Sequence, residues 1–200
     1  FHSRSGPLPA QFQQAPSSGH AGRGMIEIPA GEMIQAPQPA LLQTLLADAL
    51  GCVALAFWRS ALGYAVALLP DEAALASMPC IADQLDDDLG NGLVLMQAAA
   101  HQPERSWGLD LGPRAGLEAL QAQADYQLRF FAPRLVIRED PVTGSAHCCL
   151  APYWTEKFGR AELVGYQASP RGGEVRVILA GDRVKLLGQA VTVLRGELVS

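Results

Sequence analysis

The residues from 139 to 154 combine a carboxylate, a tight turn and the start of a helix. Pro141 and Gly144 favour the turn, and we predict that Ser145 is the N-cap residue, whose hydroxyl accepts from the first amides of the helix. A helix N-terminus attracts anions, because unpaired N–H groups and the positive end of the helix dipole meet there. Asp140, five residues before Ser145, would then lie beside a bound carboxylate and be suited to moving a proton.

The same segment also has a purely structural interpretation. Thr143 and Ser145 can simply cap a helix, and Asp140 can be a turn residue. Helix caps are far commoner than active sites. From this pattern alone, the structural interpretation is favoured.

Three side chains inside the predicted helix have the chemistry of bases or nucleophiles. Cys148 and Cys149 occupy core positions, where thiols normally serve as inert packing. His147 is interpreted in the same way, as a satisfied helix residue rather than a base. A thiol oxidoreductase that uses the two cysteines is therefore the least favoured alternative.

Two more polar residues lie outside this helix. Arg171 belongs to a Gly-rich turn, where its guanidinium can reach a substrate carboxylate, although an ordinary surface turn explains it equally well. His20, in a polar loop, is interpreted as a solvated residue. Because no second group of His or Cys stands at ligand spacing, we predict no metal site.

Composition restricts the partners. A chain of 200 residues with 49% hydrophobic and 18% charged residues can bury a core. The net charge of -5 gives no basic field for phosphate backbones, which argues against nucleic acid as a partner. The most hydrophobic stretch, residues 49–58, is shorter than the roughly 20 residues of a membrane helix, so no membrane span is predicted. The four cysteines have no paired metal-ligand spacing, and we expect reduced thiols in the cytoplasm.

Hydrophobic periodicity predicts the elements that would position these residues. The clearest is a helix over residues 39–51, with Pro39 in its first turn and Gly51 at its end. Residues 70–76 are expected to form a short helix, and residues 145–158 a longer one. Strands are predicted at residues 1–8, 25–29, 52–58, 62–69 and 92–97, and in a C-terminal meander at 175–180, 183–188 and 190–198.

Five segments occur in the order and spacing of one known family. They are Phe130-Phe-Ala-Pro133, Glu139-Asp-Pro-Val-Thr-Gly-Ser-Ala-His147, Leu150-Ala-Pro-Tyr-Trp154, Gln167-Ala-Ser-Pro-Arg-Gly-Gly173 and Gly188-Gln-Ala-Val-Thr-Val193. In these segments the chain resembles the PhzF-like isomerases of the phenazine-biosynthesis type, most specifically over residues 126–198. Residues 1–8 and 25–30 resemble a hairpin late in the family's first domain. The chain therefore resembles the C-terminal two-thirds of such a protein.

The resemblance implies an α+β fold of the diaminopimelate epimerase-like type. In this fold, each of two halves wraps a barrel-like antiparallel or mixed sheet around a central helix, and the active site lies between the halves. Residues 1–37 would be the remnant of an incomplete first half, and residues 38–189 the second half, with its central helix at about 145–158. Residues 190–200 would form a C-terminal strand that returns to the first half. Pro152 should leave the carbonyl of Cys148 without its helical donor.

The resemblance also implies a function. The family's site aspartate and serine map onto Asp140 and Ser145, which are expected to be catalytic. We expect the substrate to be bound by Thr143, Gly144, Ala146 and Arg171. The implied reaction moves a proton on a small carboxylated metabolite, in a biosynthetic process, without a cofactor, and the family's habit suggests a homodimer.

One part of the family's machinery has no counterpart in this sequence. The principal acid/base glutamate and a Gly-His-Ala-Thr motif belong to the family's first half, and the local Gly19-His-Ala21 is followed by Gly22 instead of Thr. We therefore expect the 200-residue form to be inactive alone. The alternative is a non-catalytic binding or scaffold protein derived from the family. An in-frame coding segment upstream that supplies the missing motif would favour the isomerase.

Overall fold

A curved sheet of ten strands that packs against one long helix dominates the computed structural model, which describes residues 2–3, 6–13, 22–71, 73–99 and 124–190. The strand order is β3-β4-β12-β11-β10-β9-β8-β7-β6-β5, and β1 (His2–Ser3) and β2 (Gly6–Pro7) pair separately. The strands are β3 (Ala10–Gln13), β4 (Gly22–Pro29), β5 (Met33–Gln35), β6 (Ala56–Ser60), β7 (Tyr64–Leu68), β8 (Gly92–Ala98), β9 (Tyr126–Phe131), β10 (Glu162–Gln167), β11 (Gly173–Ala180) and β12 (Arg183–Ala190). The expected α+β fold with a mixed sheet around a central helix is confirmed.

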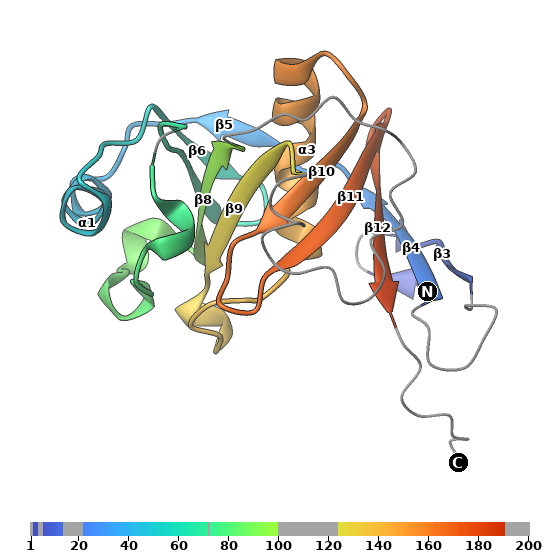
Figure 1. The fold of residues 1–200 in the computed structure, drawn as a ribbon, viewed down its shortest axis with the longest axis horizontal. Coiled ribbons are helices and arrows are strands. Elements are labelled where there is room, and N and C mark those ends of the chain that lie inside the picture. Colours follow the sequence, from blue (N-terminus) through green and yellow to red (C-terminus); the bar gives the residue numbers. More distant parts are fainter. Residues whose placement is uncertain (1, 4–5, 14–21, 72, 100–123, 191–200) are drawn as a thin grey trace, which may run out of the picture.

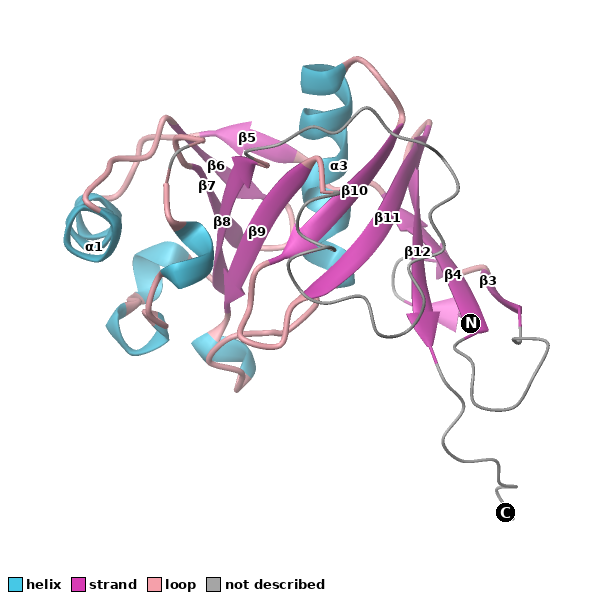
Figure 2. Ribbon diagram, in the orientation of Figure 1, coloured by secondary structure: helices cyan, strands magenta, loops and turns pink. Residues whose placement is uncertain are grey.

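Within the described ranges, two α-helices pack against this sheet. The long helix α3 (Gly144–Phe158) runs along one face of the sheet, and α1 (Ala40–Leu50) lies at the end formed by β5 to β8 (Figure 1). Figure 2 shows α1 and the short 3-10 helices on the side away from β12, β4 and β3. The short helices are η1 (Leu75–Ser77), η2 (Ala82–Gln84), η3 (Asp87–Leu89) and η4 (Pro133–Leu135). No helix among the described residues is long and apolar enough to cross a membrane.

Both faces of the central strands are buried. Successive strand residues point to opposite sides of the sheet and therefore enter two different core clusters. In β8, Val94 and Met96 belong to a core cluster that includes Leu150 and Trp154 of α3. Leu93 and Leu95 of the same strand belong to a second cluster, which includes Leu42, Leu45 and Leu46 of α1. The helix α3 is thus packed into the inner face of the sheet, while α1 covers the outer face.

A short crossing segment, residues 30–32, closes the sheet around α3. It joins β4 and β5, which stand near opposite ends of the strand order. The amide of Gly31 donates to the carbonyl of Cys148 at 3.0 Å, which is the carbonyl that Pro152 leaves without a helical donor. A Cβ at Gly31 would lie 2.6 Å from the Cα of Cys149, so only glycine allows this approach.

Most predicted elements are present, with several differences. The helix over 39–51 is confirmed as α1, with Gly51 in the left-handed conformation at φ 65°. The helix predicted at residues 70–76 is wrong, because only a single 3-10 turn, η1, forms there. Strands β3, β5, β9 and β10 were not predicted. The strand expected at 190–198 lies outside the described residues, apart from Ala190 in β12.

The proposed division at residues 37 and 189 stays a prediction. Strand β4, on the N-terminal side of the first boundary, pairs along its whole length with β12. The described parts of both segments therefore share one sheet.

Candidate functional site

Helix α3 begins at Gly144, and its N-cap residue is Thr143 rather than the predicted Ser145. The backbone of Thr143 is extended, at φ -118° and ψ 102°, and its carbonyl accepts the first helical hydrogen bond from His147 at 3.2 Å. Its own amide is fixed by the side chain of Gln167, at 2.7 Å. Because Thr143 is held in this extended conformation, Ser145 is already inside the first turn.

The side chain of Thr143 does not cap the helix. Its hydroxyl lies 2.6 Å from Oδ2 of Asp140, to which it donates. None of the described residues accepts a hydrogen bond from the amides of Gly144, Ser145 and Ala146. The start of α3 therefore has three N–H groups without an acceptor among the described residues, next to the residue that binds the Asp140 carboxylate. Gly144 and Ser145 are partly exposed, whereas Ala146 is buried. Unpaired N–H groups at a helix N-terminus favour anions.

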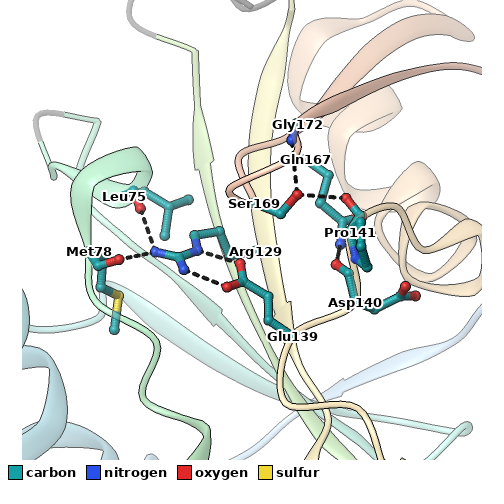
Figure 3. A network of polar contacts seen from close by, with 9 residues as sticks. All are labelled: Leu75, Met78, Arg129, Glu139, Asp140, Pro141, Gln167, Ser169 and Gly172. Carbon is teal, nitrogen blue, oxygen red and sulfur yellow. Dashed lines mark hydrogen bonds and ion pairs between the residues drawn. The ribbon is translucent and has the colours of Figure 1, made fainter.

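The turn before α3 is held by the last residue of β10 and by the loop that follows it. The amide of Gln167 donates to the backbone carbonyl of Asp140, as Figure 3 shows. The hydroxyl of Ser169 donates to the carbonyl of Pro141 at 2.9 Å and accepts from the amide of Gly172 at 3.1 Å. Both Gln167 and Ser169 are buried, so the turn has little freedom to move.

A buried ion pair fixes the residue before Asp140. The guanidinium of Arg129, on β9, makes a two-pronged contact with the carboxylate of Glu139, both N···O distances being 2.7 Å. It also donates to the carbonyls of Leu75 and Met78 and lies 4.9 Å from the ring centre of Phe131. Figure 3 shows the Asp140 carboxylate pointing away from this pair, so the ion pair anchors the chain without occupying the site.

Ser145 contacts a strand of the sheet. Its hydroxyl lies 3.0 Å from that of Tyr64, which comes from β7, and either group can be the donor. The ring of Tyr64 packs against Phe130, with ring centres 4.8 Å apart. The helix start is therefore bounded by Asp140 on one side and by the phenol of Tyr64 on another.

The remaining predicted substrate contacts fall into two groups. Gly144 and Ala146 flank Ser145; Gly144 is partly exposed and has only its backbone to offer a ligand, whereas Ala146 is fully buried. Arg171 is exposed on the loop between β10 and β11, near Ser169 in sequence. His20 lies outside the described residues.

The interior of α3 holds the other reactive residue types. Burial lowers the pKa of His147 to about 3, and its Nδ1 lies 2.8 Å from the hydroxyl of Tyr126. Burial raises the pKa of the Cys148 thiol to about 12, and it also raises the pKa of Cys149. None of the four cysteines forms a disulfide. A neutral imidazole and protonated thiols argue against a thiol oxidoreductase, because the thiolate is the reactive form. In the described part of the chain, no three His, Cys, Asp or Glu side chains form a group that could hold a metal ion.

Comparison with known proteins identifies the family. The family model described as phenazine biosynthesis-like protein (PhzC-PhzF) matches residues 1–196. The chain belongs to this family. It is 55% identical over 82 residues to an uncharacterized isomerase of Halalkalibacterium halodurans, a match that covers 41% of this chain and 31% of that protein. It is 46% identical over 82 residues to the human phenazine biosynthesis-like domain-containing protein, covering 40% of this chain and 28% of that one.

Solved structures of the PhzF family have the same fold. A PhzF-family protein of Enterococcus faecalis matches with a TM-score of 0.65 at 25% identity, covering 96% of this chain and 64% of its own. A PhzC/PhzF protein of Clostridium difficile matches with a TM-score of 0.63 at 27% identity, covering 89% and 58%. The chain thus spans less than two thirds of these relatives, and it carries the fold of PhzF-family proteins over that part.

Sequence reasoning missed three side chains that contact this candidate site. Arg129, Gln167 and Tyr64 are distant in sequence from the turn that they contact. Gln167 had a signal, because it opens the motif segment 167–173, but strand β10 was not predicted and the residue was given no role. Arg129 and Tyr64 lie on apolar strands, and nothing in their local pattern marks them.

Proposed function

We propose that this chain carries one part of the active site of a PhzF-like isomerase that moves a proton on a small carboxylated metabolite. The observation that carries the proposal is the start of α3, where the amides of Gly144, Ser145 and Ala146 have no acceptor among the described residues and adjoin Asp140. The substrate carboxylate would bind these amides. Arg171 is a second candidate contact, on the exposed loop after β10.

Asp140 would be the catalytic acid/base of this part of the site. Its carboxylate takes a proton from a carbon atom of the substrate, so that a C–H bond breaks and an O–H bond forms while the electron pair stays on the substrate. The proton is then returned at another position. No electrons are gained or lost overall, and the proposal therefore requires no cofactor.

The remaining parts of the proposed function are taken from the family resemblance. The 200-residue sequence contains no Gly-His-Ala-Thr motif, and in the family the principal glutamate belongs to the same half as that motif. We therefore propose that this form binds ligand but does not turn it over. A biosynthetic role in the cytoplasm and a homodimer complete the proposal. The rival, a binding or scaffold protein, would share the anion site and lack the proton transfer.

A titration with benzoate tests the anion site. In the 15N-labelled chain, benzoate should shift the amide resonances of Gly144, Ser145 and Ala146, whereas the neutral isostere benzamide should leave them unchanged. Asp140→Asn should bind benzoate several-fold more tightly, because a like charge beside the ligand is removed. The matched control is Asp182→Asn, which removes an exposed carboxylate in the turn between β11 and β12 and should have no effect. Equal shifts with both probes would contradict the proposal.

A deuterium-exchange assay separates the isomerase from the scaffold. In D2O, the isolated chain should incorporate no deuterium at carbon into small unsaturated carboxylic acids. A longer chain with an upstream Gly-His-Ala-Thr segment should do so, and Asp140→Asn should abolish it. Full turnover by the 200-residue chain would refute the expected inactivity.

A further inference from the structure

We infer that Gln167 and Thr143 form a directed hydrogen-bond relay that holds Asp140 through Oδ2 and leaves Oδ1 as the oxygen that exchanges the proton. The relay rests on the proposed function for its catalytic meaning, although its geometry stands alone. Gln167 and Thr143 are positioning residues here, since neither needs to contact the substrate.

The direction of the relay follows from one backbone amide. The N–H of Thr143 can only donate, so the Gln167 atom 2.7 Å away must be the oxygen, Oε1. The amide nitrogen Nε2 of Gln167 therefore faces the carbonyl of Asp140 and, at 3.1 Å, the hydroxyl oxygen of Thr143. Because Nε2 is a donor only, the Thr143 oxygen accepts from it.

The Thr143 hydroxyl proton must then point elsewhere. Its remaining neighbour is Oδ2 of Asp140, 2.6 Å away. Thr143 thus donates to Oδ2 of Asp140 while its oxygen accepts from Nε2 of Gln167. Thr143 is 6% exposed and Gln167 is fully buried, so water cannot readily replace either partner.

Oδ1 of Asp140 is left for the ligand. No described residue donates to it. With Oδ2 bound, the carboxylate keeps one orientation, and Oδ1 is the oxygen able to take a proton. Without Thr143, the carboxylate would be free to turn toward the available amides at the start of α3, where it would compete with a bound anion.

The rotamer of Asp140 tests the relay without any ligand. In the 13C,15N-labelled chain, the Hα–Hβ couplings of Asp140 should report one rotamer for the native protein and for Thr143→Ser, which keeps the hydroxyl. Thr143→Val, which is close in shape but lacks the hydroxyl, should give averaged couplings. An unchanged rotamer in Thr143→Val, or averaging in Thr143→Ser equal to that in Thr143→Val, would overturn the relay.

Gln167→Glu tests the direction. This variant keeps the size of the side chain but replaces the donor Nε2 by an acceptor, which would draw the Thr143 hydroxyl away from Asp140. The Asp140 couplings should then become averaged, and a single native rotamer would show that the direction is wrong. If this variant fails to fold, the comparison of Thr143→Ser with Thr143→Val still decides.

Benzoate binding links the relay to the site. Thr143→Val should bind benzoate about tenfold more weakly than the native chain, the size expected for one hydrogen bond to a charged group. Adding Asp140→Asn to Thr143→Val should recover most of this loss, because the competing charge is gone; a purely structural role for Thr143 predicts no recovery, and that result would overturn the competition. If the native chain does not bind benzoate while the rotamer results hold, the proposed function fails and the relay stands.

Discussion

The first turn of α3 and the middle of the same helix differ in how their polar groups are hydrogen-bonded. At the start, the side chains of Asp140, Thr143 and Gln167 bind one another, and three backbone amides remain available. In the middle, no described residue binds Nε2 of His147 or Nε1 of Trp154, although both atoms are buried. One helix thus has hydrogen-bonded polar side chains at its start and buried polar atoms without a partner among the described residues in its middle.

The difference decides where chemistry is possible. In the interior, burial drives His147 and Cys148 to their neutral forms, with pKa values of about 3 and 12. Neither group changes its charge near neutral pH, although both are typical catalytic residue types. At the start, the hydroxyl of Thr143 binds the carboxylate of Asp140, and Gln167 at the end of β10 binds its backbone carbonyl. The surroundings, rather than the residue types, therefore identify the site.

The largest expected effect is acid destabilisation through His147. Its pKa is about 6.5 when unfolded and about 3 when folded, so the unfolded state binds the proton first. The stability from a neutral His147 is complete above about pH 6.5 and is lost as the pH falls toward the folded value. Between about pH 6.5 and about pH 3.5, the loss of this contribution alone should lower the free energy of unfolding by about 4 kcal/mol.

Urea unfolding of the native chain and of His147→Gln at several pH values measures this effect. The contribution of the carboxylates cancels in the difference between the two proteins. The His147 imidazole should also show no NMR titration between about pH 5 and pH 8. Two results would contradict this: an equal loss of stability in acid for both proteins, or an NMR titration of His147 with its midpoint near pH 6.5. Either would mean that water reaches the middle of α3 and that the contrast with its start is wrong.

A similar loss is expected at the polar end from Arg129→Met. This change leaves Glu139 buried without its partner, which costs about 3–5 kcal/mol in the free energy of unfolding. Replacing both residues, as Arg129→Met with Glu139→Leu, should recover most of the stability, since no unpaired charge remains. Urea unfolding checks both. If the double variant is as unstable as the single one, the pair does more than neutralise charge.

Gly165→Ala tests how tightly the middle of α3 is packed. A Cβ at this position of β10 would lie 2.6 Å from Cε1 and Nδ1 of His147 and 2.6 Å from the ring of Tyr126. Overpacking of this kind should cost about 1–3 kcal/mol in the free energy of unfolding. Gly188→Ala is the control, because nothing lies within 4 Å of its added Cβ, and its effect should stay within about 0.5 kcal/mol.

The sequence predicted the turn and the start of α3 better than the distant side chains that hold them in place. The turn chemistry of Pro141 and Gly144 and the apolar girth of α3 are local, so helix, turn and Asp140 could be found. The N-cap was misplaced by two residues, at Ser145 instead of Thr143, because a buried side chain distant in sequence fixes the Thr143 amide. No local pattern carries that information.

Strand β10 was missed for a related reason. Its Gly165 weakens the strand pattern, yet the glycine is required because His147 and Tyr126 fill the space of a side chain. Tertiary packing selected this residue against local propensity. The side chain that holds the turn, Gln167, ends this strand and was given no role for that reason.

The smallest expected effect is at the contact between Tyr64 and Ser145. Tyr64→Phe keeps the ring against Phe130 and removes one hydrogen bond, which should cost about 0.5–1.5 kcal/mol in the free energy of unfolding. Ser145 is only half-buried, so water can replace the lost partner, and a double-mutant cycle with Ser145→Ala should give a coupling energy of about 0.5–1 kcal/mol. A coupling well above about 2 kcal/mol would mean that the first turn of α3 is as dry as its middle. The amides of this turn would then be closed to a ligand, because a group that excludes water from Ser145 would exclude a carboxylate as well.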